Sequence, residues 1–515
     1  MSAVALRERH AREAALAAVC AVLFITFLDN TIVSVALADI QTSLNSSVSG
    51  LQWIVDGYML AFAALMLTGG TLGDLFGRKK VMLGGVAIFC AGSIVAALAH
   101  GTNILIIGRV IMGVGAAASE PGTLSMIRHI YPDRQERAVA LGAWAAVSGL
   151  ALSLGPVIGG VLVAGVGWQS IFWFSVGFGA LALAWAAVTL TESSDPEGRR
   201  LDVPGLVTGA AAITAATFAV IGGENRGYGT WWIDGLFAVA AVLVVAFVEI
   251  ERRAPDPVLK IEFLRNPTFT AANVVAFATN LAVFSVFFFT ALYLQLISNF
   301  SGFQIALVFT SLAVAMIVAG PLAGRWTARV GPKVPMVLGC ALAGLGLLLV
   351  DWQLTATTTV AALSWPLAIA GLGFGIALVT MTQAVLTLVR PEESGLAAST
   401  VNTSRELGGV FGVAVLGAVV NAQLTSGLTE KLVKLGIPLQ FRTIVVHIVT
   451  TGGSTNPSDY PVAKGNLKIV AKVLLAAEGS AGHGVHLALR IAGAIVLAAA
   501  VVALFAARHR TAEVE

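Results

Sequence analysis

Charged residues are scarce in this chain. Asp, Glu, Lys and Arg make up 11% of its 515 residues, against about 25% in a typical soluble domain. Hydrophobic residues make up 57%, and the mean hydropathy is +0.87. This balance excludes a soluble globular protein and indicates an integral membrane protein with many spans. The net charge of +3 is small and spread over loops, so no nucleic-acid partner is expected.

Cysteine is rare, and histidine is missing from the middle of every apolar stretch. The three cysteines, Cys20, Cys90 and Cys340, fall inside apolar stretches, where cysteine usually acts as a small core residue. We therefore expect no disulfide and no metal site. The absence of mid-span histidine argues against a histidine proton relay. No Walker phosphate loop occurs, so we expect neither an enzyme nor a bound cofactor.

Apolar stretches of about 20 residues, the length that crosses a bilayer, occur fourteen times. They lie at 15–37, 51–71, 81–99, 104–127, 138–163, 168–190, 204–222, 232–250, 268–295, 303–325, 334–350, 361–388, 394–421 and 487–508. The expected fold class is an all-α membrane protein with 14 transmembrane helices.

The basic residues orient these spans. Over the short loops, 21 lysines and arginines fall on the side of both termini, and only Arg226 falls on the other side. Because basic loops stay inside, both termini are expected to be cytoplasmic. Long loops escape this rule, so we place 422–486 outside despite its six basic residues. Within that loop, 450–461 is rich in turn residues, and 444–449 is expected to lie on the membrane surface or form a short strand.

A charged, glycine-rich turn, GGTLGDLFGRKKVML at 69–83, separates the second and third spans. Its glycines allow close approach of the helices, which suggests a clasp that holds and releases one conformation of a transporter. The clasp residues are Gly70, Asp74, Gly77, Arg78 and Lys79. A weaker copy, GPLAGRWTARVGPK at 320–333, follows the tenth span. This spacing predicts two six-span halves with two spans inserted between them, a repeat typical of secondary transporters.

Several motifs resemble signatures of the major facilitator superfamily. The clasp resembles its loop signature, and LIIGRVIMGVGAA at 105–117 resembles its fourth-span signature through Arg109. GLALSLGPVIGG at 149–160 resembles the fifth-span antiporter signature. The residues that carry this last match are Gly149, Gly155, Pro156, Gly159 and Gly160.

Three further stretches resemble the fourteen-span drug:proton antiporter branch of that family. They are FLDNTIVSVAL (27–37), WIVDGYML (53–60) and SRELGGVFGVAVLG (404–417). The resemblance implies the major facilitator fold, with two six-helix bundles plus two inserted helices, and a monomer. The expected parts are a cytoplasmic N-terminus 1–14, an N-terminal bundle 15–190, an insertion 204–250, a C-terminal bundle 268–508 that contains the 422–486 loop, and a cytoplasmic tail 509–515. The alanine- and arginine-rich composition resembles that of a high-GC bacterium, which places this multi-pass protein in a bacterial inner membrane.

Ionisable groups inside spans are costly, at about 2.5–3.5 kcal/mol each on the insertion scale, and are therefore read as functional. Asp29 lies near the middle of the first span. A carboxyl group there can take a proton from one side, release it on the other, and bind a cationic substrate when ionised. Because proton and substrate compete for it, the expected result is antiport. The resemblance implies that Arg109 acts beside this proton site. The alternatives are a fixed Asp29–Arg109 ion pair and an arginine that extends toward the interface.

Glu120 and Glu406 are the other proton-coupling candidates. Glu120 lies deeper in the fourth span, where it could instead pair with the clasp around Arg78. Glu406 follows Arg405 near the start of the thirteenth span. Successive residues on a helix do not face each other, so we expect each to have its own partner in a structural network.

Asp56, with Trp53 and Tyr58 beside it, is expected near the outer end of the second span. A carboxylate among aromatic rings suits lipophilic cations through charge and cation–π contact, so these residues join Asp29 as substrate-binding candidates. Interfacial aromatic residues are also ordinary membrane anchors. In the fifth span, Gly155 and Gly159 are four residues apart and form a smooth packing face, and Pro156 favours a kink. The resemblance implies that this surface limits leakage and favours exchange.

The predicted function is proton-coupled multidrug efflux by alternating access, with amphipathic cationic compounds as substrates. The expected partners are a small-molecule substrate, protons and the lipid bilayer. The main alternative is a dedicated exporter of one metabolite, antibiotic, lipid or siderophore. Less favoured are a proton symporter and a non-transporting membrane protein whose 422–486 loop recruits a partner.

Overall fold

The protein is all-helical in a computed structural model. The structure describes residues 3–193, 202–257, 259–389, 394–434 and 467–507. Within these ranges, thirteen helical segments are long and apolar enough to cross a membrane. The 29-residue helix α3 (Val48–Phe76) is the fourteenth long segment. The predicted all-α fold with 14 transmembrane helices is confirmed.

The N-terminal half starts with one broken span and continues with five long helices. Its elements are α1 (Ala3–Ile32), the short 3-10 turn η1 (Val33–Ala36), α2 (Leu37–Leu44), α3, α4 (Arg78–Ala97), α5 (Thr102–Ile130), α6 (Arg134–Val166) and α7 (Gln169–Thr189). The inserted hairpin follows as α8 (Val203–Arg226) and α9 (Trp231–Arg253).

The C-terminal half repeats this plan after the short turn η2 (Ile261–Arg265). Its elements are α10 (Pro267–Ser285), the π-helical turn η3 (Val286–Thr290), α11 (Ala291–Leu296), α12 (Gly302–Val330), α13 (Lys333–Gln353), α14 (Val360–Thr387), α15 (Ser394–Lys434) and α17 (Leu467–Ala506). The internal repeat extends to the backbone of the two related turns. Gly77 (φ +110°) separates α3 from α4, and Gly331 (φ +83°) ends α12, a region of φ that favours glycine.

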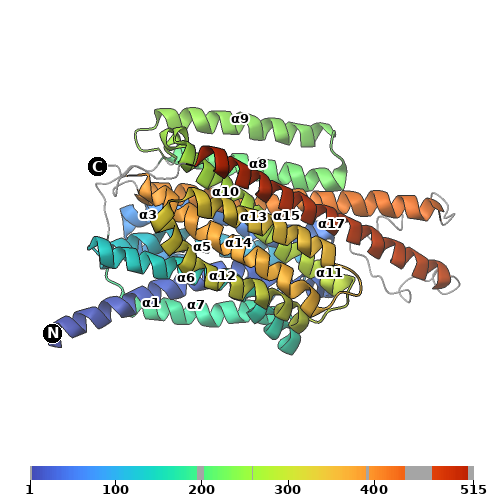
Figure 1. Cartoon of the computed structure of the whole chain (residues 1–515), viewed down its shortest axis with the longest axis horizontal. Helices are drawn as coiled ribbons and strands as arrows, with labels where there is room; N and C mark the ends of the chain where they lie inside the picture. Colours follow the sequence, from blue (N-terminus) through green and yellow to red (C-terminus); the bar gives the residue numbers. More distant parts are fainter. Residues whose placement is uncertain (1–2, 194–201, 258, 390–393, 435–466, 508–515) are drawn as a thin grey trace.

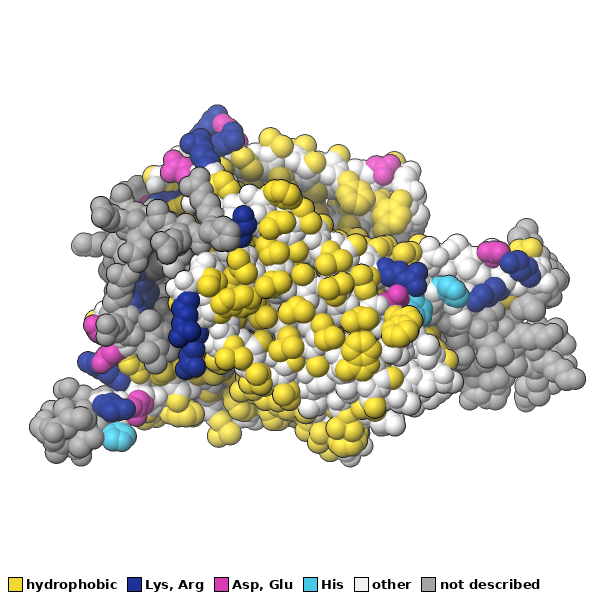
Figure 2. Space-filling model, viewed as in Figure 1, with side chains coloured by type: hydrophobic (Ala, Val, Ile, Leu, Met, Phe, Trp, Pro, Cys, Tyr) yellow, Lys and Arg dark blue, Asp and Glu magenta, His cyan; other side chains and the backbone are white. Residues whose placement is uncertain are grey.

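The helices lie side by side in an elongated bundle (Figure 1). The start of α1 and the end of α17 lie at the same end of the molecule, which we call the terminal end; the opposite end is the far end. Figure 2 shows hydrophobic side chains covering the middle of one face, whereas most charged side chains lie toward the two ends. This distribution matches a belt that faces lipid.

Two expected boundaries were wrong. The proposed 422–486 loop is helical at both ends, because α15 continues to Lys434 and α17 already begins at Leu467. Both helices extend past the rest of the molecule at the far end (Figure 1). Loss of hydropathy marks the exit from the membrane and not the end of a helix, and pairs such as Glu430–Lys434 (2.6 Å) support the exposed turns. The segments 444–449 and 450–461 and the tail 509–515 lie outside the described residues.

The inserted hairpin lies across the boundary between the two halves. Helix α8 packs against α9, but also against α3 of the N-terminal half and α15 of the C-terminal half. The ring of Trp53 on α3 lies 4.4 Å, centroid to centroid, from that of Phe218 on α8. Helix α9 is the outermost of these elements and is largely exposed. The insertion therefore contacts both halves through α8.

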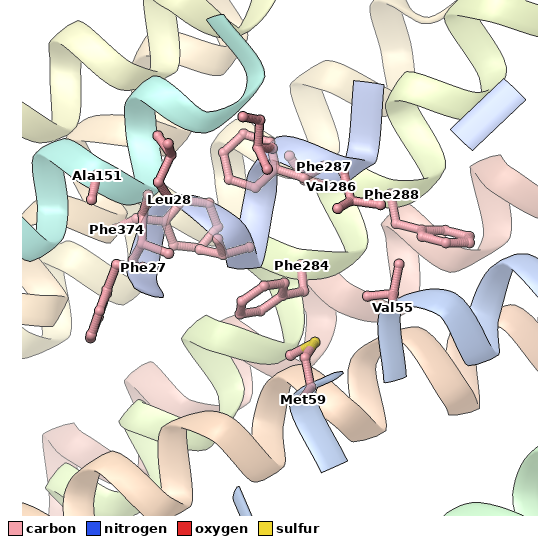
Figure 3. Packing of buried hydrophobic residues seen from close by; sticks show 14 of the residues in the cluster. Phe27, Leu28, Val55, Met59, Ala151, Phe284, Val286, Phe287, Phe288 and Phe374 are labelled. Carbon is pink, nitrogen blue, oxygen red and sulfur yellow. The ribbon is translucent and has the colours of Figure 1, made fainter. Parts of the chain in front are cut away.

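The two bundles share one buried apolar cluster. In Figure 3, Met59 of α3 points toward Phe284 of α10, and Phe27 and Leu28 of α1 lie on the other side of the same region. The space beside Gly409 of α15 is filled by Met59 and Phe284 together. Side chains from both halves therefore interdigitate around the middle of the molecule.

Candidate functional site

Asp29 and Arg109 form a buried ion pair inside the N-terminal bundle. Asp29 Oδ2 accepts from Arg109 Nη1, and both side chains are almost completely buried. Arg109 Nε also donates to the carbonyl oxygen of Ile54 at 2.9 Å. The guanidinium lies over the ring of Tyr58, 4.4 Å from its centroid. Asp29 of α1 and Arg109 of α5 are thus held together against α3. This is the fixed ion pair that was one of the alternatives from the sequence.

The three candidates on α3 face different neighbours. The hydroxyl of Tyr58 donates to the carbonyl oxygen of Thr26 at 3.0 Å, which keeps its ring beside Arg109. Asp56 is fully buried, and among the described residues neither of its carboxylate oxygens has a hydrogen-bond partner. Trp53 packs on Phe218 of the inserted helix. The structure therefore joins Tyr58 to the Asp29–Arg109 pair and turns Trp53 toward α8.

A second charged cluster lies where the two bundles meet. Arg405 Nη2 of α15 is 3.9 Å from Glu120 Oε1 of α5 and 3.3 Å from Glu406 Oε1. All three side chains are buried. The expectation of separate partners for Arg405 and Glu406 was wrong, because the long arginine side chain folds back to its neighbour. Glu120 is the acid that faces Arg405 across the boundary between the bundles. A pairing of Glu120 with the clasp around Arg78 was one of the expected alternatives.

Aromatic rings form one wall of this second cluster. The Arg405 guanidinium lies 4.7 Å from the ring centroid of Phe27, and Trp144 of α6 meets Phe27 edge-on at 6.2 Å. The indole N–H of Trp144 donates to Thr123 Oγ1 at 3.0 Å, and Thr123 Oγ1 lies 2.6 Å from the carbonyl oxygen of Glu120. Sequence reasoning did not select Phe27 or Trp144, although Phe27 is two residues before Asp29.

The fifth-span glycines pack two helices against α6. Thr31 Oγ1 of α1 donates to the carbonyl oxygen of Leu152 at 2.8 Å, and Gly155 and Gly159 leave room for Thr31 and Ile32. Gly160 faces Gly302 of α12 instead. The predicted close packing at Gly155 and Gly159 is present, beside the turn that contains Asp29. Gly149 and Pro156 lie within the continuous helix α6.

The clasp binds the end of α7. The Lys79 ammonium donates to the carbonyl oxygens of Ala187 and Leu190, at 2.7 Å each. The backbone N–H of Lys79 donates to Glu192 at 3.0 Å, and that of Arg78 donates to Ser193 at 2.8 Å. Lysine at a helix C-terminus satisfies carbonyl groups that have no partner within the helix. In the same region, Gly70 lies against Pro121 of α5. The Asp74 side chain is outside the part of the chain that the structure describes.

Gly77→Ala is expected to destabilise this clasp by about 1–3 kcal/mol, because a side chain at φ +110° is strained. A Cβ there would also stand 2.8 Å from the Glu192 carboxyl carbon. Thermal unfolding of the purified variant measures the loss. Gly84→Ala is the matched control, since a Cβ at Gly84 has no neighbour within 4 Å among the described residues and alanine favours a helix. If Gly77→Ala and Gly84→Ala have equal melting temperatures, the backbone at position 77 does not require glycine.

A π-helical turn, η3 (Val286–Thr290), interrupts the ninth span, and all five of its residues are buried. Such turns occur frequently at functional sites. No sequence pattern identified it, because its residues, VFFFT, suit an ordinary apolar helix equally well. It lies in the same buried cluster as Val55 and Met59 of α3 (Figure 3).

Two related six-helix bundles that meet at a buried charged cluster define a secondary membrane transporter, not an enzyme. The chain belongs to the major facilitator superfamily, whose family model matches residues 19–413. This confirms the family inferred from the motifs.

Curated relatives cover most of the chain. It is 32% identical over 436 residues to the multidrug resistance protein Stp of Mycobacterium tuberculosis, which covers 84% of this chain and 80% of the relative. It is 34% identical over 397 residues to the methylenomycin A resistance protein of Streptomyces coelicolor, covering 77% and 83%. It is 30% identical over 484 residues to the drug efflux pump JefA of M. tuberculosis, covering 92% and 94%.

Solved structures share the fold at low sequence identity. A bacterial homologue of the human lysosomal transporter Spinster, crystallised in an inward-facing and occupied conformation, matches with a TM-score of 0.61 at 16% identity. The match covers 96% of each chain. This likeness concerns the fold alone.

Proposed function

We propose that this protein is a drug exporter of the bacterial inner membrane that exchanges amphipathic, cationic compounds for protons by alternating access. The observation that carries the proposal is the fully buried Asp29–Arg109 pair beside the fifth-span glycines. A buried acid whose counter-ion is a fixed arginine can exchange a proton or a cation when the cavity opens. The names of the relatives, which include a multidrug resistance protein and a drug efflux pump, support export.

The terminal end is assigned to the cytoplasm by the basic residues of the loops. Several contacts between the bundles lie toward the far end. Asp39 of α2 accepts from Gln295 of α11 at 3.0 Å, and Gly160 of α6 faces Gly302 of α12. Bundles that touch at the outer end close the site to the outside. Alternation then requires the contacts at Asp39 and Gly160 to separate.

The test is reconstitution into liposomes with a pH-sensitive dye inside, an imposed proton gradient, and added ethidium. We expect ethidium-dependent proton movement with the natural protein and its loss in Asp29→Asn. The matched control is Asp234→Asn, the same change at an exposed position on α9, which should transport normally. Full coupling in Asp29→Asn would refute the role of Asp29. No proton movement with any cationic dye would refute antiport of cations.

The second candidate is a dedicated exporter of one antibiotic, favoured by the methylenomycin A resistance protein among the relatives. A host strain that expresses the protein would be grown on a panel of unrelated dyes and antibiotics. Protection against many compounds supports the multidrug proposal, and protection against a single class supports the dedicated exporter.

A further inference from the structure

Arg405 is a cation from the C-terminal bundle that lies against residues of the N-terminal bundle. Its guanidinium is 4.7 Å from the ring centroid of Phe27 on α1 and 3.9 Å from Glu120 on α5. Its other charged neighbour, Glu406, is on its own helix at 3.3 Å. The interaction with Phe27 and Glu120 therefore exists only while the two bundles are in this relative position.

Glu120 is under-satisfied in this arrangement. The residue is 1% exposed, and within the described ranges neither carboxylate oxygen has a hydrogen-bond partner. A separation of 3.9 Å is too long for a hydrogen bond, so Arg405 compensates the charge without filling the acceptor positions. The cluster also holds two carboxyl groups for one guanidinium. A buried acid with unused acceptors favours the binding of a further positive group.

The surroundings match the chemistry that recognises organic cations. An aromatic face beside a carboxylate attracts a diffuse positive charge through both cation–π and ionic terms. Phe27 supplies the face, Trp144 extends the aromatic wall, and Glu120 supplies the carboxylate. The planar, delocalised guanidinium of Arg405 resembles the charged part of such a ligand more closely than an ammonium would.

We propose that Phe27 and Glu120 form the binding site for the charged part of an organic cation, and that Arg405 is a tethered cation that occupies it in the empty transporter. The inference rests on the proposed function, since it states where the exported cation binds. An incoming cation displaces the guanidinium from Phe27 and Glu120, and Arg405 then pairs with Glu406 alone. At Glu120, binding is therefore an exchange of one positive charge for another, and afterwards each of the two buried acids has a counter-ion of its own.

The experiment measures equilibrium binding of tetraphenylphosphonium to the purified full chain at one fixed pH. Arg405→Gln removes the internal competitor, so the variant should bind about tenfold more tightly than the natural protein. Glu120→Gln should bind at least tenfold more weakly. Arg405→Met keeps a long side chain against Phe27 but carries no charge. If Arg405→Gln does not fold, the same binding measurement is made with Arg405→Met, and the same gain in affinity is expected. Arg490→Gln is the matched control, because Arg490 pairs with Asp351 of α13 at 2.8 Å, within the C-terminal bundle, and its loss should leave affinity unchanged.

The anion tetraphenylborate, of the same shape and opposite charge, completes the design. If Arg405 instead binds an anionic substrate, Arg405→Gln will lose tetraphenylborate binding and gain nothing for the cation, which would overturn the proposal. Unchanged or weaker cation binding in both Arg405 variants would also overturn it. If the natural protein binds no cation but Arg405→Gln does, the tethered cation is supported while the proposed substrate class is not. If neither binds, both ideas fail.

Discussion

Arg109→Met is expected to lower the free energy of unfolding by about 3–5 kcal/mol, since it leaves one member of a buried ion pair uncompensated. The Asp29 carboxylate would lose its counter-ion, and the carbonyl oxygen of Ile54 would lose the hydrogen bond from Arg109 Nε. The Tyr58 ring would lose the guanidinium that lies over it. Reversible unfolding in mixed detergent micelles with increasing dodecyl sulfate measures the change.

The double variant Asp29→Asn/Arg109→Met is the informative control. It removes both charges, and replacing a buried ion pair by neutral groups is often close to neutral for stability. We therefore expect it to recover most of the loss, although proton coupling stays absent. A double variant as unstable as Arg109→Met alone would show that the arginine stabilises the fold through packing and not through the charge of Asp29.

Gly160→Val is expected to shift the protein toward a state that is open at the far end. A Cβ at Gly160 would stand 2.6 Å from Ala306 of the opposite bundle. Overpacking typically costs about 1–3 kcal/mol. Because this contact exists only while the far end is closed, that cost becomes a population shift of about 5–150-fold.

Disulfide cross-linking across the far end measures this shift. Asp39→Cys and Gln295→Cys replace the two residues that hydrogen-bond between the bundles, in a chain whose three natural cysteines are changed to alanine. Cross-linking should be fast in this parent and much slower with Gly160→Val. The neighbouring Gly159→Val is the matched control. Its Cβ would stand 2.7 Å from the Ile32 carbonyl oxygen within the same bundle, so it should lower stability without slowing cross-linking. Equal rates in the parent and Gly160→Val would contradict the prediction.

The sequence was sufficient for the number of helices, the repeat and the family. Long apolar stretches have one stable form in a membrane, and the turn glycines Gly77 and Gly331 mark equivalent positions in both halves. It was also sufficient to select Asp29 and Arg109, since charge inside a span is costly enough to need a partner. Their pairing stayed one alternative among others, because periodicity gives the face of a helix but not the helix that it meets.

Contacts between distant helices were the part that the sequence could not supply. Arg405 and Glu120 are far apart in the chain and meet only because the two bundles pack at this level. Trp53 turned toward Phe218 because the inserted helix α8 lies there, and no motif indicates where an insertion packs. The roles of Asp29 and Glu120 in transport stay predictions for the experiments above, and a role of Asp56 in substrate binding also stays a prediction.

The position of α8 makes the molecule asymmetric toward its lipid surroundings. Where α3 and α15 meet, α8 packs on both helices. This junction between the two bundles is therefore covered by α8 on its membrane side. The junction of α6 with α12 has no such cover among the described helices. An oily compound dissolved in the bilayer therefore meets a shielded flank on one side and a bare one on the other. We therefore expect membrane-borne compounds to enter sideways at the flank of α6 and α12, where Gly160 faces Gly302.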